Sequence, residues 1–134
     1  MNEYEIRFTL ANISNKIKLK LLQMYNNEEN IYNNIDEILK SDMMSLKDKI
    51  KIKEDSYEDK MNFVKALNDN SIKTIRITEE DYPEKLRNID DPPYILFYKG
   101  ELSLAYDDMI AVVGSRKSSI YGLDAAKYLS REIC

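Results

Sequence analysis

The sequence predicts an α/β protein in two parts, an all-helical region over about residues 1–68 and an α/β region over about residues 70–134. Two observations support this division. Apolar residues recur at helical spacing before residue 70, whereas short β-branched or continuously apolar runs follow it. All three glycines and all three prolines fall after residue 80, so the first part contains neither helix breaker.

The first region should contain about four or five short amphipathic helices. Breaks are expected at Asn26-Asn27 and Ser41-Asp42, because Asn, Ser and Asp favour caps and turns over helix interiors. The apolar residues that define the faces are Tyr4, Phe8 and Ala11; Ile17, Leu21 and Met24; Ile31, Ile35 and Ile38; Met43, Leu46 and Ile50; and Tyr57, Met61 and Val64.

The second region opens with a strand, predicted by the short β-branched run at residues 72–77. Thr78-Glu79-Glu80-Asp81 then suits the cap and acidic first turn of a short helix. Pro83 fits near the start of that helix, and Leu86 and Ile89 should supply its buried side.

Asp90-Asp91-Pro92-Pro93 should end this helix, because a residue before proline is pushed out of helical geometry. Two strands are then expected, at residues 94–98 and 109–113. The latter is a continuous apolar run, typical of a strand covered on both faces in a parallel sheet. We expect Tyr82 and the two prolines to fix the approach to the strand at 94–98, and we expect a helix from about Ser119 onward.

Composition excludes several classes of function. With no histidine and a single cysteine at position 134, the chain can build neither Ser-His nor Cys-His catalysis, nor a disulfide or thiolate metal cluster of its own. The net charge of −4 means that any nucleic-acid contact must come from a local cluster. No apolar run is long enough to span a bilayer and the N-terminus lacks a signal pattern, so we expect a cytoplasmic protein with no membrane contact. The alternating lysines at positions 47, 49, 51 and 53 have acidic neighbours and are expected to form a solvated face.

The candidate binding site is the turn between the strand at 109–113 and the following helix. A helix start offers unpaired N–H groups and the positive end of its dipole, and a glycine allows close approach, so the turn should bind phosphate. No nucleotide cofactor is predicted, because neither a dinucleotide fingerprint nor a P-loop fits when the next glycine is Gly122. A purely structural turn with solvated charges is the alternative. The predicted phosphate-binding residues are Gly114, Ser115, Arg116, Lys117 and Ser118.

Two motifs follow one another in the second region: Asp81-Tyr82-Pro83, Leu86, Ile89, Asp91-Pro92-Pro93, Leu96, Tyr98, Gly100 and Leu102, then Ala111-Val112-Val113-Gly114-Ser115-Arg116 and Tyr121-Gly122. Together these motifs resemble the DNA processing protein A (Smf) family. The similarity covers about residues 77–134 and implies the first part of a Rossmann-like parallel-sheet domain. The helical region resembles the small sterile-alpha-motif-like domain that often precedes it, although residues 13–17 lack the glycine of the family's helix-hairpin-helix versions. The chain is therefore expected to be a fragment that ends inside the Rossmann-like domain.

The resemblance implies a single-stranded DNA-binding protein, not an enzyme, that protects incoming DNA and loads the RecA recombinase during natural transformation. It also implies a homodimer, and a positively charged pocket to which Gly114, Ser115 and Arg116 contribute; Lys117 and Ser118 are added from the helix-start argument above. Two alternatives stay open. One is a Rossmann-like enzyme acting on nucleoside monophosphates, and the other is a module that only binds a protein partner.

Overall fold

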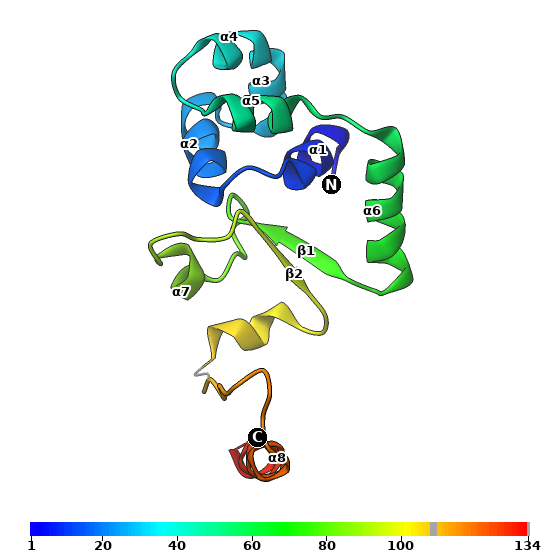
Figure 1. The fold of residues 1–134 in the computed structure, drawn as a ribbon, viewed down its shortest axis with the longest axis vertical. Helices are drawn as coiled ribbons and strands as arrows, with labels where there is room; N and C mark the ends of the chain where they lie inside the picture. The colour runs from blue at the N-terminus through cyan, green and yellow to red at the C-terminus, as the bar shows by residue number, and fades with distance from the viewer. Residues whose placement is uncertain (108–109, 134) are drawn as a thin grey trace. The chain divides into compact units, whose positions relative to one another are not determined.

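The computed structural model describes residues 1–107 and 110–133 (Figure 1). It divides into two compact units, Met1–Leu102 and Ser103–Cys134. The boundary expected at residues 68–70 does not coincide with this division, because the strands that follow residue 70 share a core with the preceding helices.

The first unit begins with six helices, where about four or five were expected. The additional helix arises because the apolar run from Ile31 to Ile38 is interrupted at Asn34, which ends one helix and starts the next. The expected breaks at Asn26-Asn27 and Ser41 are confirmed, and Asn26 adopts a left-handed φ of 70°. The helices are α1 (Glu3–Leu10), α2 (Asn15–Tyr25), α3 (Glu28–Asn33), α4 (Ile35–Lys40), α5 (Leu46–Lys53) and α6 (Tyr57–Asp69).

Polar side chains define where most of these helices start. The first backbone N–H groups of a helix have no intrahelical acceptor, and a capping oxygen satisfies one of them. Asn2 and Glu5 form a reciprocal capping box at α1. The other capping side chains that accept a first-turn N–H are Ser14, Asn27, Ser45 and Ser56. Polar capping side chains therefore define these helix starts, and neither glycine nor proline is needed for them.

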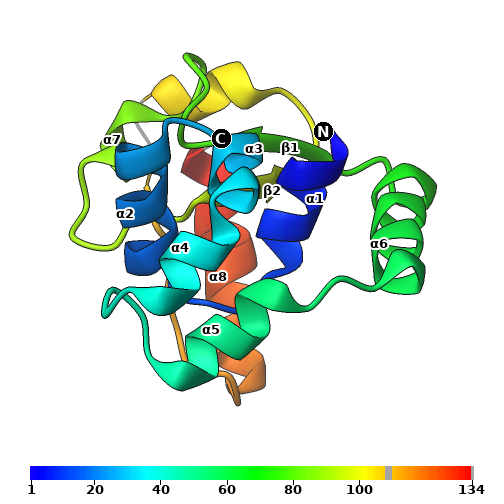
Figure 2. The ribbon, with the colours of Figure 1, turned by 90° about the horizontal axis from the view of Figure 1, so that it is seen from above.

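The core of the first unit joins the helices to the strand region. Helices α1 to α5 each contribute one almost completely buried side chain, and Tyr94, just before the second strand, lies among them. The rings of Phe8 and Tyr94 meet edge to face, with centroids 5.1 Å apart. Helix α6 contributes no buried residue and stands at one side of the helical cluster (Figure 2). The five buried helical residues are Phe8, Leu21, Ile31, Ile38 and Ile52.

The sheet has fewer strands than predicted, and its strands pair antiparallel where parallel pairing was expected. Strands β1 (Lys73–Arg76) and β2 (Ile95–Tyr98) confirm the predicted runs at 72–77 and 94–98. They pair antiparallel, with Lys73 opposite Tyr98 and Arg76 opposite Ile95. Among the described residues these two strands form the whole sheet, so the predicted parallel arrangement is not present there. The chain is α/β in content, and the Rossmann-like and sterile-alpha-motif-like assignments stay predictions.

The segment between the strands contains a turn where a helix start was expected. Glu79 folds back, and its carboxylate accepts hydrogen bonds from the Arg76 backbone N–H at 3.0 Å and from Nε at 2.8 Å. Helix α7 (Glu84–Arg87) begins only after Pro83. Ile89 is exposed and so does not form the buried side predicted for it.

Tyr82 has the structural role expected of it. Its side chain is buried, and its hydroxyl donates to the Pro93 carbonyl oxygen at 2.8 Å. Arg87 lies over the ring, 5.7 Å from its centroid. Tyr82 thereby ties the turn before α7 to the proline pair that precedes β2.

The second unit contains the predicted helix but lacks the predicted strand. After the 3-10 helix η1 (Leu102–Tyr106), which spans the division between the units, α8 (Ile120–Ile133) starts close to the expected position. Residues 110–113 form no strand and are exposed, Val113 to 88%; Met109 lies outside the described residues. A strand of this kind requires neighbours for its backbone hydrogen bonds, and no described strand pairs with this segment.

Candidate nucleic-acid interface

The predicted phosphate-binding turn, residues 114–118, leads directly into α8 and is exposed along its whole length. The Lys117 backbone N–H donates to the Ser115 hydroxyl oxygen at 3.2 Å, which folds the turn locally. Glycine is not needed for its backbone conformation, because φ at Gly114 is not positive. The turn is thus an accessible loop held by its own serine.

Ser119 forms the start of α8. Its hydroxyl oxygen accepts the Gly122 backbone N–H at 3.2 Å, and its carbonyl oxygen accepts the Leu123 N–H at 3.1 Å. The backbone N–H groups of Ile120 and Tyr121 have no acceptor among the described residues. The helix start therefore retains free donors beside the turn.

Two cations of the turn are unpaired. Within the part of the chain that the structure describes, neither Arg116 nor Lys117 forms an ion pair or a side-chain hydrogen bond. Both side chains are exposed. Their charges are available to an anion without first breaking an internal contact.

A hollow of about 460 Å³ lies against the turn and the first part of α8. Four of the five predicted residues line it, and Arg116 does not. The structure thus brings Gly114, Ser115, Lys117 and Ser118 together, whereas Arg116 lies outside this lining. The lining residues that are not among the five predicted are Val112, Val113, Ser119, Gly122, Leu123 and Ala126.

The two glycines of the site are not explained by packing inside the described residues. A Cβ added at Gly114 would meet no atom within 4 Å. One added at Gly122 would make only ordinary contacts, 3.5 Å from the Ser119 Oγ and 3.8 Å from the Ser118 Cβ. A small residue at these positions leaves room for a ligand to approach the backbone.

A second polar cluster, in the first unit, was not predicted from the sequence. Arg76 pairs with Glu5, with Glu28 at 3.5 Å and with Glu79 at 2.8 Å. The Tyr94 hydroxyl donates to Glu28 at 2.6 Å, and burial is the largest cause that raises the pKa of that hydroxyl. This cluster joins β1 and the start of β2 to α1 and α3, so its charges are committed to the fold.

Lys18 of α2 is also buried, with 6% of its surface exposed. Its ammonium group donates to the Thr9 carbonyl oxygen at 3.0 Å and lies over the Phe8 and Tyr94 rings. Burial lowers the pKa of Lys18 to about 8. No described group of three or more acidic, histidine or cysteine side chains could hold a metal ion. Likewise, none of the described helices combines the length and apolarity that crossing a bilayer requires.

Comparison with known proteins agrees with the resemblance in the two motifs. The family model of DNA recombination-mediator protein A matches residues 73–134. The match covers 62 of the 134 residues, so this part of the chain is similar to that family. The match begins at β1 and includes the whole of the predicted phosphate-binding turn.

One curated relative is the DNA processing protein DprA of Bacillus subtilis (strain 168). It is 39% identical over 70 residues, which is 52% of this chain and 24% of the relative. The chain therefore spans about a quarter of the length of that relative. No solved structure is significantly similar to the chain.

Proposed function

We infer that the chain serves in a cytoplasmic DNA-processing protein that binds single-stranded DNA, protects it and delivers it to the RecA recombinase during DNA uptake. One observation carries this proposal. The segment that matches the family model presents two exposed cations, Arg116 and Lys117, that have no partner among the described residues, beside a helix start whose first backbone donors have none there either.

The chemistry of the turn suits a phosphate diester. Phosphate oxygens accept hydrogen bonds from backbone N–H groups, hydroxyls and cationic side chains, and the segment from Gly114 to Tyr121 contains all three. Lys117 lines the hollow and Arg116 does not, so we assign them to neighbouring phosphates of one strand. Contacts to phosphate carry no base information. A protein that must hand over any incoming sequence requires this kind of contact.

The proposed role involves no catalysis and no cofactor. A single turn offers few phosphate contacts, and affinity for nucleic acid grows with the number of neutralised phosphates. We therefore include a homodimer in the proposal, because two copies of the turn would double these contacts.

The test uses the full-length natural protein that contains this sequence. Single-stranded oligonucleotides of unrelated sequence should shift in a native gel to the same extent, and immobilised protein should retain purified RecA. Incubation with nucleoside monophosphates should release no free base. Base release would support the enzyme alternative instead, and retention of a protein without any DNA shift would support the interaction-module alternative.

A further inference from the structure

Helix α5 presents an apolar and basic face that its own fold leaves uncovered. Leu46 is 77% exposed and Ile50 is 57% exposed. They lie one helical turn apart, so they share a face, and Lys53 extends that face by a further turn. Lys47 borders it. We call these four residues the α5 face; the opposite side of the helix buries Ile52 completely.

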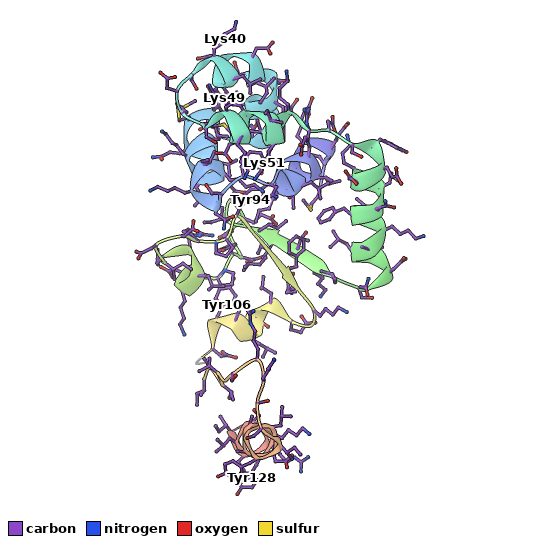
Figure 3. All side chains as sticks on the ribbon, viewed as in Figure 1. Lys40, Lys49, Lys51, Tyr94, Tyr106 and Tyr128 are labelled. Atoms are coloured by element: carbon purple, nitrogen blue, oxygen red, sulfur yellow. The ribbon has the colours of Figure 1, made fainter. Side chains whose placement is uncertain are left out.

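The α5 helix is the basic part of an acidic chain. It holds four lysines and one aspartate, a charge of +3, whereas the whole chain carries −4, which leaves −7 for the rest. Lys49 donates to the Ser41 carbonyl oxygen at 2.5 Å, and Lys51 donates to the Asn12 carbonyl oxygen at 2.6 Å (Figure 3). Two of the four lysines that were expected to form a solvated face are therefore bound to the protein's own backbone.

Of the other three charged residues of the helix, one is bound within the described part of the protein and two are not. Asp48 accepts a hydrogen bond from the Ser45 hydroxyl at 2.5 Å and is engaged at the helix start. Lys47 and Lys53 form no ion pair among the described residues. The α5 face therefore combines two uncovered aliphatic side chains with two free ammonium groups.

This combination selects among possible ligands. A nucleic-acid strand would use the lysines but leave Leu46 and Ile50 in water, and α5 has no aromatic residue for a base to stack on. A membrane surface would require a larger apolar face than α5 offers, because two aliphatic residues bury little area in a bilayer interface. A protein segment can satisfy both features at once.

We propose that the α5 face docks an acidic amphipathic segment of a partner protein. Apolar side chains of the segment cover Leu46 and Ile50, and its carboxylates pair with Lys47 and Lys53. This surface is independent of the phosphate-binding turn, so it can serve a partner other than DNA.

The experiment uses a fluorescein-labelled peptide of roughly 14 residues, with leucines at i, i+4 spacing and glutamate elsewhere, and a second peptide with lysine in place of glutamate. Anisotropy should report binding of the acidic peptide to the natural protein. The Leu46→Ser/Ile50→Ser double variant should weaken this binding about tenfold or more, and about 0.5 M NaCl should weaken it as well.

The matched control is the Tyr57→Ser/Met61→Ser double variant. It removes residues of similar exposure, 75% and 51%, from the start of α6, where the neighbours Glu58 and Asp59 are acidic. It should leave peptide binding unchanged, and circular dichroism should show that both double variants are folded.

Several results would overturn the proposal. They are no binding of the acidic peptide, equal binding by the α5 double variant, an equal loss in the α6 control, or equal binding of the lysine peptide. Two further results would assign the α5 face to another occupant. One is attachment to phosphatidylcholine–phosphatidylglycerol vesicles that depends on Leu46 and Ile50, and the other is self-association of the protein that the α5 double variant abolishes.

Discussion

Two cations of the first unit and two of the second lie in opposite surroundings. In the first unit, Arg76 is held by three carboxylates and Lys18 is sealed between two aromatic rings and a carbonyl oxygen. In the second, Arg116 and Lys117 are exposed and have no described partner. Cations of the first kind are engaged inside the fold and are not available to a ligand. Charges of the second kind contribute nothing to a described contact, which leaves them free for a ligand.

The largest expected effect is a loss of stability when the buried cluster around Glu28 and Tyr94 is disrupted. Tyr94→Ala removes a ring packed against Phe8 and leaves Glu28 buried without its hydroxyl donor. The free energy of unfolding should fall by about 3–5 kcal/mol, measured by urea denaturation. Tyr57→Ala removes a side chain that is 75% exposed and should change the free energy of unfolding by no more than about 0.5 kcal/mol. Equal losses in the two variants would contradict the distinction between buried and exposed side chains.

The next effect concerns Arg116 in the full-length protein. Arg116→Ala should weaken single-stranded DNA binding by about 1.5–3 kcal/mol, the usual contribution of a charged hydrogen bond, and leave stability unchanged. Losses should be similar for different base sequences, because a phosphate contact reads no base edge. Arg131→Ala, which removes the same charge from the last turn of α8, is the matched control and should bind normally. A loss confined to one base sequence would mean that Arg116 contacts bases.

Lys18→Met tests the buried cation and should stabilise the protein at pH 7 by about 1–3 kcal/mol, because an apolar side chain of similar length avoids the desolvation cost. The pKa of Lys18 is about 8 in the folded state and 10.5 ordinarily, so the unfolded chain binds more protons between these values. The wild-type unfolding free energy should therefore rise with pH from about 8 upward, and the advantage of the variant should shrink. Denaturation at pH 7, 8 and 9 compares the two proteins, and an advantage that does not change with pH would contradict the assignment.

The smallest expected effect is that of Lys117→Ala. Lysine is a point charge without the fork geometry of arginine, so DNA affinity should fall by less than in Arg116→Ala, by about 1 kcal/mol. Oligothymidine anisotropy provides the measurement, with Lys127→Ala of α8 as the control. If Lys117→Ala weakened binding more than Arg116→Ala did, the hollow that Lys117 lines would be the main phosphate site.

Features set by neighbouring residues were predictable from the sequence. The break at Asn26-Asn27, the two strands and the start of α8 follow from side chains within a few positions of each. The turn at residues 114–118 could be proposed as a phosphate site for the same reason, because its glycine, serines and cations are contiguous. Only the three-dimensional structure shows that Arg116 lies outside the hollow.

Features that depend on distant partners were not predictable. Residues 110–113 have a strand-like composition, yet no described strand pairs with them. Tyr94 and Glu28 are 66 positions apart, so no local pattern could connect them. The antiparallel pairing of β1 with β2 and the packing of this two-stranded sheet against the helices depend on long-range contacts of the same kind.

The central claim is that the turn at residues 114–118 binds phosphate, and the salt dependence of DNA binding tests it most directly. Oligothymidine affinity would be measured for the full-length wild type and Arg116→Ala at several salt concentrations. Loss of one phosphate contact should lower the slope of log affinity against log salt by about 0.7, the single-strand value per neutralised phosphate. An unchanged slope together with an unchanged affinity would contradict this account and make the turn a structural element only.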